Sequence, residues 1–228
     1  MSHTYEYPRP ALTADVVAVR FDGSGLQVLL IERARDPFSG RWALPGGFVG
    51  MDETVERAAA RELAEETGLE GVEVEQLHTF SDPSRDPRTR VVSVAHLALV
   101  GMDVAVRAGD DAAQARFAPL AEAKDLAFDH DRIVEDGLDR LRFKARYEAF
   151  GLELLSPRFT LSELQKLYEV VLGRSLDKRN FRKKMLSRGY LVATGEFQKG
   201  VAHRAARFFR FDRRKYKGFG KKASDLEA

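Results

Sequence analysis

The sequence predicts two domains: an α/β sandwich, followed by a smaller basic domain built from helices and a strand pair. Apolar residues in the first 150 positions alternate between strand-like and helix-like periodicity. The helical pattern then ends around residues 150–158, at Gly151 and Pro157. Residues 1–150 carry 18 Lys+Arg and 27 Asp+Glu, whereas residues 151–228 carry 19 and 8, so the net charge changes from −9 to +11. We therefore expect domains at 1–150 and 151–228, with residues 217–228 as a frayed tail.

The first domain is expected to contain four strands and two helices. Strands are predicted over residues 12–19 and 26–31, separated by a Gly-rich turn at 22–25, and over residues 72–80 and 91–100. The last of these is apolar on both faces, which is typical of a buried strand. A helix is expected over residues 129–147, with Val134, Leu138 and Leu141 on one face. Strands covered by helices on both faces form an α/β/α sandwich.

The helix predicted over residues 54–67 carries the clearest chemical signal. It contains no Gly or Pro, Asp52 or Thr54 can cap its start, and Gly68 is suited to end it. Glu62, Glu65 and Glu66 are spaced at i, i+3 and i+4, so their carboxylates share one face. Such a hard oxygen set suits Mg²⁺ or Mn²⁺, and the alternative is a solvated acidic face.

A longer motif surrounds these carboxylates. Residues 47–69 read GFVGMDETVERAAARELAEETGL, which resembles the Nudix box, a Mg²⁺ site that cleaves diphosphates linked to a nucleoside. The resemblance implies the Nudix α/β/α sandwich with a mixed sheet. It also implies that a Gly46 carbonyl joins Glu62, Glu65 and Glu66 at the metal. The catalytic set would be Glu66, Glu62, Arg61 and Glu53, with Arg61 and Glu53 as an orienting pair; the general base stays open between Glu62, Glu65, Glu66 and a carboxylate elsewhere such as Glu122.

Substrate contacts rest on arginines. The loop at residues 81–90 reads SDPSRDPRTR and resembles the loop of Nudix proteins that bind ADP-ribose. Guanidinium groups there are suited to a diphosphate. A charge-balanced surface turn, or arginines with a structural role, would give the same sequence pattern. His78 and His96 fall in strand patterns and are interpreted as core residues rather than ligands. The candidate substrate-binding residues are Arg33, Arg41, Arg85 and Arg88.

The basic domain has the outline of a winged helix-turn-helix. A helix capped by Thr160 or Ser162 is expected to run to Leu172, and a second helix capped by Asp177 to end at Gly189. Strands over 190–192 and 207–211 would form the wing. The inward-facing side chains of the second helix are expected to be Phe181, Met185 and Leu186.

The second helix is the candidate DNA-recognition helix. Its lysines and arginines would contact phosphates, while Asn180 or Arg182 could contact base edges. Charge alone fits RNA, a protein partner or no partner as well as it fits DNA. The candidate DNA-binding residues are Lys178, Arg179, Asn180, Arg182 and Lys183 on the helix, and Lys199 and Arg204 on the wing.

A second resemblance connects the two domains. The segment FTLSELQKLYEVVLGRSLDKRNFRKKM resembles the winged-helix domain of the NrtR-type regulators, which fuse it to a Nudix domain and control NAD-metabolism genes. Many of these regulators have an eroded Nudix box and only sense ADP-ribose, whereas all the box carboxylates are present here. The resemblance therefore implies a DNA-binding regulator that binds, and with its intact box hydrolyses, ADP-ribose or a related nucleotide. The alternatives are a plain ADP-ribose pyrophosphatase with a structural second domain, and a non-catalytic repressor.

Composition restricts the remaining possibilities. The chain has no Cys, which excludes disulfides and thiolate metal sites and fits a reducing cytoplasm. Its N-terminus lacks the basic lead and apolar core of a signal peptide, and no apolar run reaches the ~18 residues of a membrane span. We expect a cytoplasmic homodimer, because two-fold DNA operators favour paired winged helices.

Overall fold

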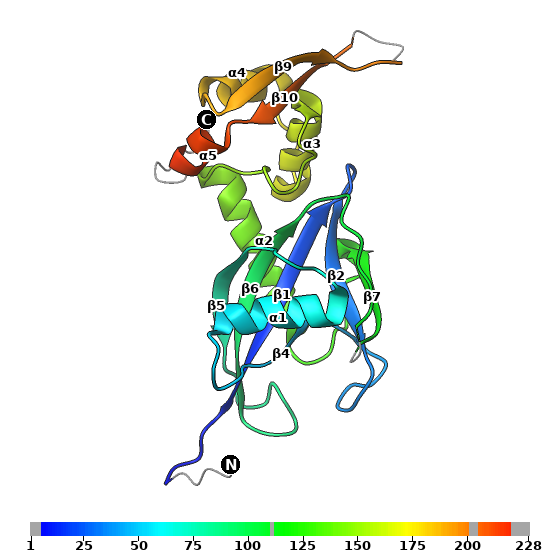
Figure 1. The fold of residues 1–228 in the computed structure, drawn as a ribbon, viewed down its shortest axis with the longest axis vertical. Helices are drawn as coiled ribbons and strands as arrows, with labels where there is room; N and C mark the ends of the chain where they lie inside the picture. The colour runs from blue at the N-terminus through cyan, green and yellow to red at the C-terminus, as the bar shows by residue number, and fades with distance from the viewer. Residues whose placement is uncertain (1–5, 110–111, 201–204, 220–228) are drawn as a thin grey trace. The chain divides into compact units, whose positions relative to one another are not determined.

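The computed structural model describes residues 6–109, 112–200 and 205–219. The chain divides into two compact units. The first unit comprises Met1–Val19, Gln27–Leu99 and Val104–Gly137, and the second comprises Arg20–Leu26, Val100–Asp103 and Leu138–Ala228. The helices and strands of both units carry the labels of Figure 1.

The first unit is built on a sheet of seven strands within the described residues. β1 is central, and its residues Ala14 and Val16–Ala18 are fully buried. The order along the sheet is β3-β2-β1-β6-β5, while β4 pairs with β1 and β7 pairs with β2. The strands are β1 (Ala11–Phe21), β2 (Leu26–Arg33), β3 (Trp42–Ala43), β4 (Gly46–Phe48), β5 (Val74–Phe80), β6 (Val91–Val100) and β7 (Ala112–Pro119).

Helix α1 (Val55–Thr67) lies across this sheet (Figure 1). The Thr54 side chain accepts a hydrogen bond from the Arg57 N–H, and Gly68, in the left-handed conformation, ends the helix. Its residues Ala58, Ala59 and Leu63 are buried. A one-turn helix, η1 (Leu120–Glu122), follows β7.

Helix α2 (His130–Tyr147) starts in the first unit and continues into the second. Its first half packs against β1 at Gly137, where an added Cβ would lie only 2.9 Å from Val17 Cγ1. None of the helices in the described part of the chain is long and apolar enough to cross a membrane.

The second unit contains the helix-turn-helix and wing outline. A capping box joins Thr160 and Glu163 at the start of α3, and Asp177 caps α4. The core is aromatic, with Tyr168 packed edge-on against Phe150 and Phe181. The elements are β8 (Phe159–Thr160), α3 (Leu161–Leu172), α4 (Lys178–Ser187), β9 (Leu191–Phe197), β10 (Arg207–Phe211) and α5 (Arg213–Phe219), with strand order β8-β10-β9.

Some expectations differ from the structure. Leu186 is 47% exposed instead of inward-facing, because Phe181 and Met185 already fill the buried face of α4. The His78 side chain is 71% exposed, whereas His96 is buried as expected. Helix α5 extends to Phe219, into the segment expected to fray, and residues 220–228 and Arg204 lie outside the described residues.

Candidate functional site

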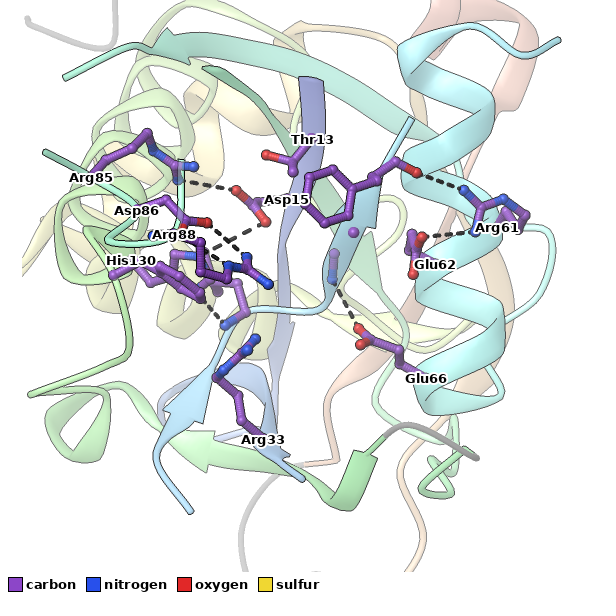
Figure 2. A pocket seen from close by; sticks show the side chains of 15 residues that line it. Thr13, Asp15, Arg33, Arg61, Glu62, Glu66, Arg85, Asp86, Arg88 and His130 are labelled. Atoms are coloured by element: carbon purple, nitrogen blue, oxygen red, sulfur yellow. Dashed lines mark hydrogen bonds and ion pairs between the residues drawn. The ribbon is translucent and has the colours of Figure 1, made fainter. Parts of the chain in front are cut away.

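A polar pocket of about 330 Å³ lies in the first unit. One wall is the Gly46–Gly47 segment with α1, and the opposite wall combines the 81–90 loop with the start of α2 (Figure 2). β1 supplies the floor through Thr13 and Asp15. Segments far apart in sequence therefore meet at one cavity.

The two glycines before α1 allow close approach to acidic side chains. A Cβ on Gly46 would lie 2.5 Å from Asp15 Oδ1, and a Cβ on Gly47 would lie 2.4 Å from Glu62 Oε1. A side chain at Gly47 would collide with the Glu62 carboxylate, and one at Gly46 would also collide with the Ala14 carbonyl oxygen of β1, which would lie 2.4 Å from its Cβ.

Glu66 is the most perturbed acid at this wall. Its Oε2 accepts a hydrogen bond from the Gly46 N–H at 2.9 Å. Burial is the main reason that its pKa rises to about 8; the Gly46 hydrogen bond opposes the rise, and negative charge on Glu62 and Asp15 adds to it. The pKa of Glu62 is also raised, mainly by burial. These carboxylates therefore lack sufficient positive charge around them.

Arg61 organises the outer side of the same helix. It holds Glu53 with two hydrogen bonds, Nη2–Oε1 at 2.6 Å and Nε–Oε2 at 3.1 Å. Its Nη1 also contacts Glu62 at 2.8 Å and Glu65 at 3.0 Å, and its Nη2 donates to the Phe48 carbonyl. Hydrogen bonds from Arg61 and from the Gly50 N–H hold the pKa of Glu53 at about 2. Arg61 thus joins the helix to the β4 wall of the pocket.

The predicted metal ligands are only partly together. Gly46, Glu62 and Glu66 line the pocket, but the Glu65 side chain is 60% exposed and turned to Arg61. Among the described residues, no three His, Cys, Asp or Glu side chains converge closely enough to hold a metal ion. The charge still fits a cation, because two half-buried or buried glutamates with raised pKa face a gap that glycines keep open.

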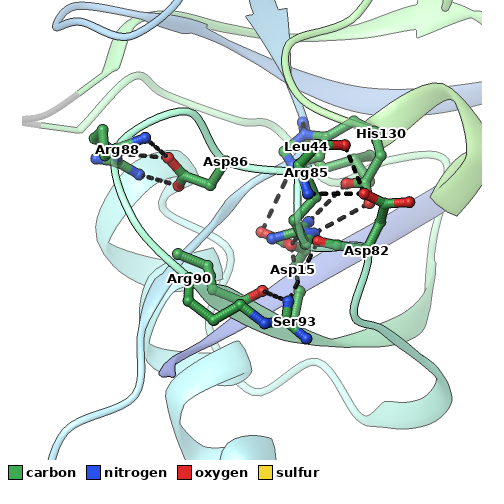
Figure 3. Close-up of polar contacts among 12 residues, drawn as sticks. Asp15, Leu44, Asp82, Arg85, Asp86, Arg88, Arg90, Ser93 and His130 are labelled. Atoms are coloured by element: carbon green, nitrogen blue, oxygen red, sulfur yellow. Dashed lines mark hydrogen bonds and ion pairs between the residues drawn. The ribbon is translucent and has the colours of Figure 1, made fainter. Parts of the chain in front are cut away.

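Arg85 is a buried residue engaged with acids of the protein itself (Figure 3). Its Nη2 and Nε contact Asp129 at 2.7 and 3.1 Å, and its Nη2 lies 3.4 Å from Asp15 Oδ2. The Ser93 hydroxyl also donates to Asp15. Arg85 therefore links β1 to the start of α2 through Asp15 and Asp129. Because its guanidinium is engaged with these two carboxylates, little of it is left for the substrate contact predicted from sequence.

His130 is fixed in one tautomer. Its Nδ1 accepts the Leu44 N–H at 2.9 Å, so the proton of the neutral ring is on Nε2, which lies 3.8 Å from Asp15 Oδ1. Burial lowers the pKa of His130, and nearby Asp15 opposes this. The ring is therefore a neutral donor at the pocket floor.

Two arginines lie across the pocket from Glu62 and Glu66, with Arg33 at the end of β2 and Arg88 in the 81–90 loop (Figure 2). The Arg33 guanidinium lies 4.8 Å from the centroid of the Phe128 ring, and that of Arg88 lies 5.8 Å from the same centroid. Arg88 is 42% exposed and is held by Asp86 at 2.7 and 3.0 Å. Burial lowers the pKa of Arg33, and the positive charge of Arg88 adds to this effect.

The fourth predicted substrate residue lies elsewhere. Arg41 does not line the pocket, because its Nη2 donates to the Asp125 carbonyl at 2.6 Å and its guanidinium lies over Phe38. The sequence interpretation also missed Thr13, Asp15, Asp86, Phe128 and His130, which do line it.

The second unit carries its own groove of about 590 Å³ between α3, α4 and the β9–β10 strands. Lys178 and Arg182 of α4 and Arg207 of β10 line it. Arg182 Nη2 donates to Ser162 Oγ at 3.2 Å, and its buried Nε has no partner among the described residues. Lys178 is exposed, as are the candidates outside the groove lining, Arg179, Asn180, Lys183 and Lys199.

Comparison with known proteins finds a matching family model for each of the two domains. The family model for the NUDIX domain matches residues 10–137. The chain belongs to the Nudix family. The model for the NrtR DNA-binding winged helix domain matches residues 151–211. The fold predicted from sequence, a Nudix sandwich followed by a winged helix, is thereby confirmed.

The relatives of this Nudix protein include a regulator and an enzyme. It is 36% identical over 210 residues to the ADPR responsive transcriptional repressor NtrR of Acinetobacter baylyi, covering 90% of this chain and 84% of that protein. It is 43% identical over 131 residues to the ADP-ribose pyrophosphatase of Methanocaldococcus jannaschii, covering 57% of this chain and 74% of the enzyme.

Solved structures match either nearly the whole chain or its Nudix part. The crystal structure of Shewanella oneidensis NrtR complexed with a 27mer DNA matches with a TM-score of 0.80 and 31% identity, covering 94% of this chain and 99% of the other. The NUDIX domain of that protein complexed with ADP ribose matches with a TM-score of 0.56 and 35% identity, covering 59% of this chain and 90% of the other.

Proposed function

We propose that this chain is a DNA-binding repressor that responds to ADP-ribose, or to a related nucleoside diphosphate, bound in the pocket of its Nudix unit. The observation that carries the proposal is the distribution of charge in the pocket. Glu62 and Glu66 lie on one wall, and Arg33 and Arg88 on the other. A diphosphate brings anionic oxygens to the arginines and, together with a divalent cation, neutralises the glutamates.

Each predicted site residue then has a distinct role. Arg33 and Arg88 bind the diphosphate, whereas Arg85 keeps Asp15 and Asp129 in place. Gly46, Glu62 and Glu66 hold Mg²⁺ or Mn²⁺, with Glu65 as an outer ligand that must leave Arg61 to reach the ion. When bound, the metal supplies Lewis-acid chemistry and a water of lowered pKa. Arg61 and Glu53 fix the orientation of α1 against β4.

Hydrolysis of the ligand is the second part of the proposal. Its support is the complete set of box residues and the arrangement of Arg61, which holds both Glu53 and Glu62 at the pocket. The protein would convert ADP-ribose to AMP and ribose 5-phosphate. A purely sensing repressor needs only binding, so turnover separates the two cases.

The second unit is the part of this proposal that binds DNA. The exposed basic face of α4 is suited to the major groove, and the cations of the neighbouring groove to a phosphate backbone. We infer that a cytoplasmic homodimer presents two such helices to a two-fold operator, in genes of NAD metabolism.

Calorimetric titration of the full chain with a non-hydrolysable ADP-ribose analogue and Mg²⁺ tests the ligand assignment. Arg33→Met should weaken binding at least about tenfold, because a charge-assisted contact to a phosphate is removed. The matched control is Arg116→Met on neighbouring β7, which pairs with Glu122 outside the pocket and should bind like the parent. Equal affinities for all three proteins would refute a diphosphate site between these walls.

A further inference from the structure

The ring of Phe128 occupies an unusual position beside the pocket. Its backbone φ is 57°, in the left-handed region that bulky side chains rarely adopt. Phe38 packs edge-on against it, with centroids 4.9 Å apart and an interplanar angle of 71°. The backbone of Phe38 is also left-handed, at φ 65°. Surrounding contacts therefore hold the Phe128 ring in a conformation that the isolated residue would not favour.

The same ring lies close to two cations from different segments. Arg33 comes from β2 and Arg88 from the 81–90 loop, and their guanidinium carbons lie 4.8 and 5.8 Å from the ring centroid. Two like charges this close to one ring repel each other, and the lowered pKa of Arg33 reflects that repulsion in part. An aromatic ring attracts cations through its negative face, which offsets the repulsion.

We propose that Phe128 is a positioning residue, whose ring holds Arg33 and Arg88 together so that both meet the diphosphate of the ligand. This inference rests on the proposed function, because it assumes that these arginines bind a diphosphate. Asp86 forms hydrogen bonds to Arg88 and acts on Arg33 only through its charge, while Arg33 is otherwise bonded to the Pro37 and Arg35 carbonyls of its own loop. The Phe128 ring is thus the direct side-chain contact that the two guanidiniums have in common among the described residues.

A second use of the ring would be stacking on the nucleobase of the ligand. Phe48, which also lines the pocket and is exposed, lies 5.6 Å from the Arg88 guanidinium, so a flat base has aromatic surface available. The two roles differ in the part of the ligand whose binding depends on the ring. Positioning affects any diphosphate, whereas stacking affects only ligands that carry a base.

The test replaces Phe128 in the full chain by phenylalanine analogues of increasing fluorination. Fluorination weakens the negative face of the ring while keeping its shape, so folding is preserved. Binding is measured by calorimetry with a non-hydrolysable ADP-ribose analogue and with inorganic diphosphate, both in the presence of Mg²⁺. We expect dissociation constants to rise stepwise to about fivefold for the pentafluoro ring, and equally for both probes. The same analogues at Phe80, a β5 ring outside the pocket, should change neither constant.

Each other outcome is informative. If the parent protein binds neither probe, the proposed function fails before Phe128 is tested. If the parent binds both and fluorination has no effect, the ring has only a structural role and the inference is overturned. A loss confined to ADP-ribose also overturns it in favour of base stacking. Phe128→Tyr should retain the affinity that Phe128→Leu loses, because only tyrosine keeps the ring.

Discussion

Glu66 combines burial with a shortage of positive charge, and this combination affects stability as well as chemistry. Its pKa in the folded, metal-free protein is about 8, compared with an ordinary value of 4.5. In the metal-free fold the protonated form of Glu66 is therefore favoured over the ionised form. The associated stability is fully present below about pH 4.5 and is lost as the pH rises through about 8.

Glu66→Gln should consequently raise the melting temperature of the metal-free protein near pH 9 and change it little near pH 5. The neutral amide keeps an oxygen that can accept the Gly46 N–H. The measurement is thermal unfolding with a chelator at both pH values, and the control is Glu70→Gln, an exposed glutamate after α1. A variant that is less stable than the parent near pH 9 would contradict the assignment of an uncompensated charge.

The same substitution should nearly abolish turnover. We expect Glu66→Gln to lower ADP-ribose hydrolysis at least ~100-fold, as loss of a metal ligand or base does. Glu65→Gln should cost less, on the order of tenfold, because its side chain lies outside the pocket on Arg61. Product formation with Mg²⁺ is compared for both variants and the parent. Equal losses would place Glu65 inside the metal site, and no product from the parent would leave a sensing repressor.

At this scale, the sequence revealed the residues that share one local motif. Glu62, Glu66 and Arg61 could be predicted as site residues from the sequence, because helical spacing alone brings them together. Asp15, Phe128 and His130 come from a strand and a loop far from the box, and only tertiary structure brings them to the pocket. An aspartate inside the apolar strand LTADVVAV was an available signal, since a buried acid needs partners.

At the scale of elements, the helices were predictable because their end signals are local. The structure uses Thr54 and Gly68 for α1, Thr160 and Gly173 for α3, and Asp177 for α4. Strands β3, β4 and β7 were not predicted. β3 and β4 span two and three residues, β7 is rich in alanine, and all three form by pairing with β1 or β2. Helix α5 was not predicted because its sequence is basic and its buried Tyr216 alone forms no helical pattern.

The exposed face of α4 gives a prediction about DNA. Asn180→Ala should relax sequence preference, because an amide can contact a base edge, whereas Lys183→Ala should weaken all sequences alike. Lys183→Ala should also reduce the salt dependence of binding by about 0.9 in the logarithmic slope. Fluorescence anisotropy over a range of salt concentrations measures both effects.

Lys166→Ala is the matched control, since this exposed lysine lies on α3 and outside the groove. If Lys183→Ala and Lys166→Ala behave alike, α4 is not the recognition helix.

At the scale of the whole molecule, the two units must communicate if the ligand controls DNA binding. We expect ADP-ribose to weaken operator binding by a coupling of about 1–3 kcal/mol, and DNA to weaken ADP-ribose binding by the same factor. The Glu66→Gln variant is used so that the ligand survives the titration. An unchanged DNA dissociation constant at saturating ADP-ribose would leave the two units uncoupled by this ligand and favour the plain enzyme.

Helix α2 has a practical consequence for anyone who divides this protein into fragments. Its eighteen residues are one continuous helix, yet the boundary between the compact units falls in its middle, between Gly137 and Leu138. A truncation at that point would leave two helix stubs, each with unsatisfied backbone groups, and short stubs unravel in water. A Nudix fragment that keeps residues up to about 150 retains the helix intact, and it is the better choice for crystallisation or for measuring ligand binding without DNA.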